Sequence, residues 1–299
     1  MNQRLIIIAA VSLLASGSGL AQPRPGSGDE TRIEVPGGDI FGFTDPADVG
    51  DAGDKSLGLE TTTRIGKTRG LYASPTLKTE LSHTIAPNLA VSLASFLTGH
   101  RIRAVPGLDD RSSVRFDGLS TEVLYRFLER GPGNPFAATF SFEPRISRVD
   151  ELTGERATGY EAEFKLFLDA VLVPERLYGA VNLNYAVGAQ RAPSGSGGTS
   201  EASSGTAISG ALAYQLSERL FIGGEARWLT EFSGALLNDL SGQALFAGPT
   251  MLVKLSDKAA FNVSWTPQIA GRSQDNPGRR LDLDNFERHQ LRVKFATNF

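Results

Sequence analysis

Charged side chains of both signs recur at every second residue along much of this 299-residue chain. In one stretch, Glu161, Glu163, Lys165 and Asp169 alternate with apolar residues. Rows of ionisable groups of this kind can line a pore and set its ion selectivity. The candidate lumen and selectivity residues are Glu60, Arg64, Lys78, Glu80, Glu122, Arg126, Glu143, Arg145, Glu161, Glu163, Lys165, Asp169, Glu225, Arg227, Glu231, Arg288, Arg292 and Lys294.

Two interpretations of these charges stay open. In the first, opposite charges pair across neighbouring strands and fill the interior. In the second, an acidic wall and a basic wall face each other across a narrow wet pore and set its selectivity. We favour the second, and Glu60 is an expected partner of Arg292 and Lys294, because the last strand of a closed sheet lies beside the first.

The three histidines are the candidate catalytic bases. A hydrolytic site needs a nucleophile, a base within hydrogen-bond reach and a group that orients the base. His83 and His100 fall near opposite ends of their expected strands, and His289, near the outer end, is the best candidate. The Ser-Gly repeat at residues 194–197 indicates a loop rather than a nucleophile elbow. We therefore expect no enzyme and no catalytic residue.

Asp45, Asp48, Asp51 and Asp54 raise the possibility of a calcium site. Their spacing is three residues, whereas an EF-hand loop uses alternate positions and a closing Glu. The chain has no cysteine, which excludes thiol catalysis, Cys-ligated zinc and iron–sulfur clusters. We expect no metal and no cofactor.

The elements that must position these residues are strands, because apolar and polar residues alternate with period two from residue 57 onward. We predict an all-β fold, a closed antiparallel transmembrane β-barrel of about twelve strands, with ten or fourteen as alternatives. The predicted strands span 57–66, 71–86, 89–103, 114–128, 136–148, 159–173, 177–190, 205–216, 220–232, 243–255, 259–271 and 286–299.

A soluble β-sandwich also alternates, with its polar face in water. Two features favour the membrane. Connections after even-numbered strands are short, whereas most of those after odd-numbered strands are longer and polar, as at 150–159, 191–204 and 271–285; 67–70 is an exception. An even strand count also places both chain ends on one side. Outward aromatic residues suit the two interfacial girdles: Tyr125, Tyr185, Tyr214, Trp228, Trp265 and Phe299.

The first 21 residues have the three parts of a secretory signal peptide: a positive start with Arg4, a short apolar core and small residues before Gln22. Residues 22–56 predict a flexible periplasmic N-terminal segment or a small plug in the lumen, and the flexible segment is preferred. Residues 57–299 form the predicted barrel.

The chain ends in LRVKFATNF, with apolar residues at alternate positions before a terminal phenylalanine. This ending resembles the C-terminal insertion signal of Gram-negative outer-membrane β-barrel proteins, carried here by Leu291, Val293, Phe295 and Phe299. The resemblance implies that the chain resides in the cell outer membrane, contacts its lipid, and meets the barrel-insertion machinery and periplasmic chaperones during biogenesis. Shorter stretches at 116–120, 142–144 and 248–250 look like small putative transporters or channels of this class.

The net charge of −3 excludes the basic balance typical of nucleic-acid-binding proteins. We predict a narrow passive channel or transporter for small solutes whose selectivity is set by the lumen charges, and no motif identifies the solute. One alternative is a non-conducting structural or surface-binding barrel. The other is an outer-membrane hydrolase acting on lipid or peptide.

Overall fold

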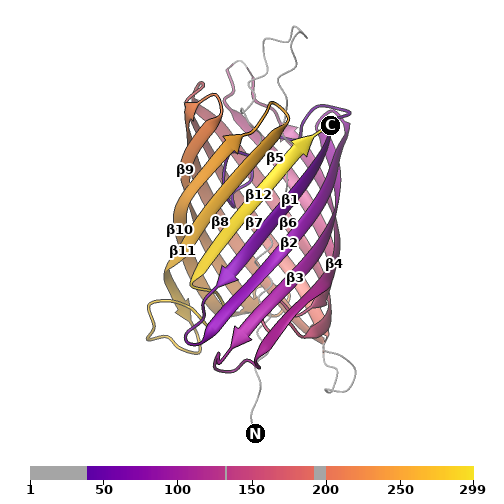
Figure 1. Cartoon of the computed structure of the whole chain (residues 1–299). Helices are drawn as coiled ribbons and strands as arrows, with labels where there is room; N and C mark the ends of the chain where they lie inside the picture. Colours follow the sequence, from indigo (N-terminus) through magenta and orange to yellow (C-terminus); the bar gives the residue numbers. More distant parts are fainter. Residues whose placement is uncertain (1–38, 132, 192–199) are drawn as a thin grey trace.

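A computed structural model describes residues 39–131, 133–191 and 200–299. These residues form a closed barrel of twelve antiparallel strands (Figure 1), which confirms the predicted fold. No helix in the described ranges is long and apolar enough to cross a bilayer. The strands are β1 (Lys55–Ile65), β2 (Leu71–Ala86), β3 (Leu89–Arg103), β4 (Arg111–Leu128), β5 (Phe136–Val149), β6 (Arg156–Val173), β7 (Leu177–Arg191), β8 (Ser200–Ser217), β9 (Leu220–Ser233), β10 (Asp239–Lys254), β11 (Ala259–Ser273) and β12 (His289–Asn298).

The barrel closes where the last strand meets the first. Strand β12 pairs with β1 along one edge, with Lys294 opposite Glu60 and Arg292 opposite Thr62, and with β11 along the other edge. Closure leaves no sheet edge whose backbone groups would lack partners, and in hydrocarbon each unpaired group costs several kcal/mol. The C-terminus lies with the short connections at one end of the barrel, which we call the turn end; the opposite end is the loop end (Figure 1).

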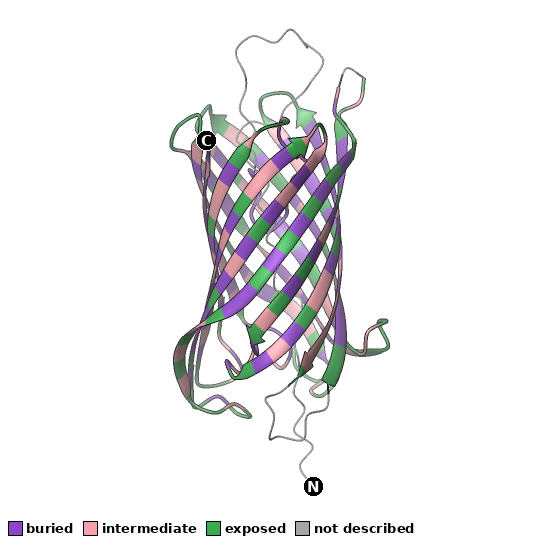
Figure 2. Ribbon diagram, turned by 90° about the vertical axis from the view of Figure 1, so that its right-hand side faces the viewer, coloured by how far each residue is buried: buried purple, intermediate pink, exposed green. Residues whose placement is uncertain are grey.

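Burial alternates along every strand, as the striped ribbons of Figure 2 show. In β12, Gln290, Arg292 and Lys294 are buried, whereas the residues between them are partly exposed. The outward face carries apolar side chains such as Leu93 and Ile208, each more than half exposed. An apolar outside and a charged inside invert the arrangement of a soluble domain and match the lipid-facing and lumen-facing surfaces of a membrane barrel.

Several strands reach further toward the loop end than the sequence pattern predicts. Strand β8 begins at Ser200 instead of residue 205, and its first residues pair with the end of β7. Ladder hydrogen bonds join backbone groups, so a Ser/Gly-rich stretch can continue a strand beyond the apolar belt. Consequently the connections at 104–110, 150–155 and 234–238 are short, and residues 274–288 form the long loop-end connection among the described residues.

The predicted signal peptide, residues 1–21, lies outside the described residues, as do residues 22–38 and the Ser-Gly repeat at 194–197. The described part of the N-terminal segment runs inside the barrel and joins β1 at the turn end. There Gly53 N–H donates to Thr84 O at 2.8 Å, which extends the β1–β2 ladder.

Candidate functional site

The lumen gathers nearly all of the charged residues singled out from the sequence. They are buried, except that Glu161 is half-buried and Arg288 is exposed. The prediction of Arg288 as a lumen residue is wrong, because β12 begins one residue later, at His289. The Arg288 backbone N–H still donates to Gly66 O at 2.8 Å, so the chain is held at the rim while the side chain is exposed.

One side of the lumen is acidic. We call its residues the acidic wall: Lys78, Glu80, Glu122, Glu143, Glu163 and Lys165, from β2, β4, β5 and β6. The Lys165 Nζ lies 2.6 Å from Glu143, 3.2 Å from Glu163 and 3.3 Å from Glu122. Lys78 Nζ is 2.5 Å from Glu80. Four carboxylates thus share two ammonium groups, and the wall keeps an excess of negative charge.

The other side is basic. The basic wall consists of Arg227 on β9, Asn262 on β11, and Arg292 and Lys294 on β12. Arg292 Nη2 lies 2.6 Å from Glu60, the partner expected from strand closure. Arg227 Nη2 donates to Thr266 and Gln290 at 3.0 and 2.5 Å. The buried carboxylates of Glu225 and Glu231 on β9 and Glu60 on β1 lie on the same strand as these groups or on the adjacent one.

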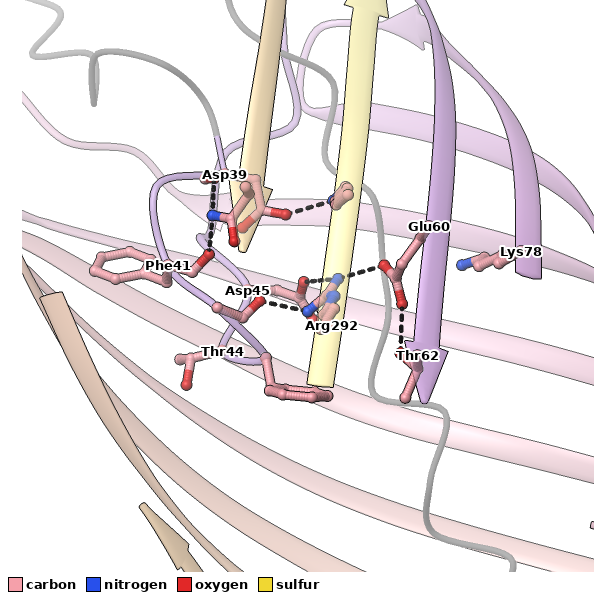
Figure 3. Close-up of polar contacts among 12 residues, drawn as sticks. Asp39, Phe41, Thr44, Asp45, Glu60, Thr62, Lys78 and Arg292 are labelled. Atoms are coloured by element: carbon pink, nitrogen blue, oxygen red, sulfur yellow. Dashed lines mark hydrogen bonds and ion pairs between the residues drawn. The ribbon is translucent and has the colours of Figure 1, made fainter. Parts of the chain in front are cut away.

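Residues 39–50 lie inside the barrel, and all of them are buried. We call them the lumen segment. Figure 3 shows its first part against β12 and β1. Asp39 forms an ion pair with Lys294, and Asn262 Nδ2 donates to Phe41 O at 2.5 Å. Arg292 Nη1 donates to Gly42 O at 2.5 Å. The basic wall therefore binds this part of the segment through side-chain cations and an amide.

The middle of the lumen segment is fixed by one carboxylate of the barrel. The backbone N–H groups of Phe43 and Thr44 both donate to Glu225 Oε2, at 2.7 and 3.1 Å. The Phe43 ring lies under the Arg227 guanidinium, 3.6 Å from the ring centroid to Cζ. A desolvated cation–π contact of this kind contributes about 2 kcal/mol.

The end of the lumen segment crosses to other strands near the turn end. Ala47 N–H donates to Asp169 at 2.8 Å, and Thr139 Oγ1 donates to Ala47 O at 2.5 Å. Asp48 accepts from Arg126 Nη1 at 2.9 Å. The segment therefore spans the lumen from the β11–β12 side to the β4–β6 side.

Gly42 allows the lumen segment to lie against the wall. A Cβ at this position would stand 2.4 Å from Glu225 Oε1 and 2.7 Å from Ser264 Cβ. Both distances are shorter than van der Waals contact, so a side chain at residue 42 would force the segment and the wall apart.

Two loops close over the loop end of the lumen. From the β11–β12 connection, Phe286 packs against Phe246, and Lys67 Nζ donates to Phe286 O at 2.9 Å. From the β5–β6 connection, Glu151 forms an ion pair with Arg64. Burial raises the pKa of the Glu151 carboxyl to about 7, although the Arg64 guanidinium acts in the opposite direction.

A small cavity of about 40 Å³ lies near the Glu151 loop. Asp117, Arg145 and the half-buried Glu161 contribute to its lining. Arg145 Nη2 lies 2.6 Å from Asp117. Regular alternation along β4 would place the Asp117 side chain on the lipid-facing surface. Gly118 adopts φ 136° and the β3–β4 register shifts there, so Asp117 turns inward. The glycine that directly follows Asp117 was the sequence signal for this inward turn.

The three histidines have separate surroundings. His100 Nε2 lies 2.8 Å from Glu151 O and 3.3 Å from Ser74 Oγ inside the loop end. The ring of His289 lies 5.8 Å from that of Trp265 on the outer surface. His83 Nδ1 lies 3.1 Å from Asp54 O near the turn end.

Comparison with known proteins supports the architecture. A family model described as "Family of unknown function (DUF6662)" matches residues 34–299, whereas no curated protein matches the sequence. The β domain of the Bordetella autotransporter BrkA is 11% identical, with a TM-score of 0.53 over 83% of this chain and 100% of that one. The translocator domain of NalP from Neisseria meningitidis is 12% identical, with a TM-score of 0.50 over 82% and 88%.

The KdgM porin in complex with disordered oligogalacturonate is also similar, at 12% identity and a TM-score of 0.46, over 82% of this chain and 99% of that one. These likenesses extend to the fold alone. The comparison therefore shows a shared closed antiparallel β-barrel fold.

Proposed function

Since this chain belongs to DUF6662, a family of unknown function, we propose its activity from the lumen itself: a narrow passive channel for small solutes, closed by residues 39–50. The observation that supports this proposal is that the basic wall binds a segment of the chain that is not part of the barrel. Asp39 forms an ion pair with Lys294, and the Gly42 carbonyl oxygen accepts a hydrogen bond from Arg292.

If the charged residues served only to fill the lumen, the charges of each wall would be expected to pair with one another. Burying charged groups costs several kcal/mol per ion, and well-packed apolar residues often do as well or better. The acidic wall follows that pattern, with Lys165 between three carboxylates. The basic wall instead relies in part on the lumen segment, whose polar contacts water could replace if the segment moved.

The wall charges would set the selectivity of the open channel. Without the lumen segment, the basic wall would face the acidic wall across the lumen, and a field between opposite walls orders ions by their charge. Barrels of eight strands are filled by side chains, and those of sixteen or more leave a wide channel, so twelve strands suit a narrow passage.

We further propose that the protein resides in the outer membrane of a Gram-negative cell, reached through its signal peptide and the alternating C-terminal residues ending in Phe299. It would contact outer-membrane lipid and, during biogenesis, the insertion machinery and periplasmic chaperones. It would act without a cofactor and would not be an enzyme. These proposals rest on the sequence pattern and on the closed barrel fold.

A second candidate is a non-conducting barrel, and the self-paired acidic wall favours it. Single-channel conductance separates the two. The refolded chain 22–299 is compared in a planar bilayer with a variant that lacks residues 22–50 but keeps 51–54, because Gly53 and Asp54 belong to the β1–β2 ladder. We expect small or rare steps from the first and larger, salt-dependent steps from the second. Folded protein that stays silent in both forms would overturn the channel function.

A further inference from the structure

The lumen segment carries three carboxylates, and each lies beside a cation of the barrel. Asp39 contacts Lys294, Asp45 lies 3.8 Å from Arg292 Nη2, and Asp48 lies 2.9 Å from Arg126. Figure 3 shows Asp39 and Asp45 on the same side of β12 as Arg292. The basic wall therefore offers two carboxylate sites, at Lys294 and Arg292, and a part of the same chain occupies both.

The lumen segment leaves hydrogen-bonding groups unsatisfied at the site where Asp45 lies beside Arg292. Asp45 is fully buried, yet neither of its carboxylate oxygens accepts a hydrogen bond. On the wall, the buried Nε–H groups of Arg292 and Arg227 also find no acceptor. A buried polar group without a partner destabilises the arrangement that buries it. The basic wall therefore offers donors that the lumen segment leaves unused, and the segment carries a carboxylate that is poorly satisfied.

The two cations of β12 are suited to a solute with two negative groups. Arg292 and Lys294 are two residues apart on one strand, so they share a face at a Cα separation of about 7 Å. A dicarboxylate could bind both at once, whereas chloride would neutralise one at a time. Arginine adds a planar fork that matches a carboxylate through two parallel hydrogen bonds.

We propose that a small acidic solute with two carboxylates binds Arg292 and Lys294 in place of Asp45 and Asp39, and that this exchange releases the lumen segment and opens the channel. The inference rests on the proposed channel function and specifies its solute class and its gate. Because the segment is tethered to β1, its aspartates compete at an effective concentration in the millimolar range. The solute should therefore act at millimolar concentrations.

The absence of cysteine makes the exchange measurable. Ala47 is fully buried in the lumen segment, so Ala47→Cys places the single thiol of the protein where a bulky maleimide reaches it only after release. The full mature chain, reconstituted in lipid vesicles, is labelled in succinate, in putrescine, and in sodium chloride at matched ionic strength. Succinate and putrescine have similar length and opposite charge.

We expect succinate to accelerate labelling about tenfold, as displacement of one of two ion pairs would do. Putrescine and sodium chloride should leave the rate unchanged. The response should disappear when Arg292→Gln and Lys294→Gln are added, and persist with Arg176→Gln, which removes an exposed arginine from a turn outside the lumen. Equal acceleration by succinate and putrescine, or a succinate response without Arg292 and Lys294, would overturn the inference.

Bilayer conductance recorded on the same Ala47→Cys protein separates this inference from the channel function. Labelling that responds to succinate in a silent bilayer supports the carboxylate site and contradicts the channel. Conductance steps without any succinate response contradict the carboxylate site and leave the channel function standing.

Discussion

The two walls of the lumen hold their charges in different ways. On the acidic wall, Lys165 lies within 3.3 Å of three carboxylates that all belong to barrel strands. On the basic wall, Lys294 contacts Asp39 and Arg292 contacts Gly42, both from the lumen segment. Charge pairing on the first wall is fixed by the sheet. On the second wall Arg292 also pairs with Glu60 of β1, whereas Lys294 depends on Asp39, in a segment joined to the barrel at one described end.

Because of this difference, charged residues on the two walls should have separate roles, one in stability and the other in opening. Removing one partner from a buried network leaves uncompensated charge and costs about 3–5 kcal/mol. If the partner can move away and water can enter, the remaining charge becomes solvated and the cost falls toward that of an exposed pair, about 0–1 kcal/mol. The acidic wall should therefore govern stability, and the basic wall should govern opening.

The largest effect is expected for Lys165→Met. It leaves Glu122, Glu143 and Glu163 without their shared ammonium, and the free energy of unfolding should fall by about 3–5 kcal/mol. The matched variant Lys294→Met should lose less than about 1 kcal/mol. Urea unfolding in lipid vesicles, followed by tryptophan fluorescence, measures both. Equal losses of unfolding free energy in the two variants would contradict the distinction between the walls.

The next effect is on opening. Gly42→Leu places a side chain where a Cβ already meets Glu225 and Ser264 at 2.4 and 2.5 Å, so the lumen segment should leave its site. Conductance should rise to the level of the variant without residues 22–50, while the unfolding free energy changes by about 1 kcal/mol or less. Gly210→Ala, on the partly exposed face of β8 where a Cβ would lie 3.9 Å from Ala180 O, is the control for a glycine replacement outside the lumen. A closed Gly42→Leu barrel would show that the segment does not gate the pore.

Substitutions that remove charge from the two walls should shift ion selectivity in opposite directions. Arg292→Ala with Lys294→Ala removes positive charge and should shift ion preference toward cations by about threefold or more. Glu122→Gln with Glu163→Gln, on the acidic wall, should shift it toward anions. Reversal potentials in a salt gradient measure each shift in the variant background without residues 22–50. Unchanged reversal potentials in both would remove the walls as the source of selectivity.

The smallest expected effect is a pH dependence at the loop end. The pKa of Glu151 is about 7 with its loop closed, above the ordinary value, because burial favours the neutral carboxyl. Closure is therefore favoured at low pH, and it weakens as the pH rises from the ordinary value of about 4.5 to about 7. Conductance of the variant without residues 22–50 should rise about threefold between about pH 4 and pH 7.

Glu151→Gln should remove this dependence, because the amide cannot ionise. His100→Gln tests the neighbouring imidazole, which lies 2.8 Å from Glu151 O, and should leave this pH dependence in place. A pH response that follows His100 instead of Glu151 would contradict the assignment.

The strand order and the facing of most residues could be predicted because a membrane barrel imposes a period of two on every strand. The approach of Arg292 to Glu60 followed from closure alone. Parity failed where the backbone departs from regular pairing: at Asp117, where Gly118 shifts the register, and at Arg288, which precedes β12. The contacts of the lumen segment could not be predicted, because residues 39–50 have no repeating pattern and their partners lie up to 255 residues away.

The central claim, that residues 39–50 close the lumen, is tested most directly by fixing them in place. Thr139 Oγ1 lies 2.5 Å from Ala47 O, so Ala47→Cys with Thr139→Cys places two thiols close together in a chain without other cysteines. Single-channel recordings are compared before and after a reductant, with each single cysteine variant as control. We predict that the oxidised double variant is silent and that reduction restores the steps of the single variants. Full conductance through a barrel with the disulfide formed would contradict the account.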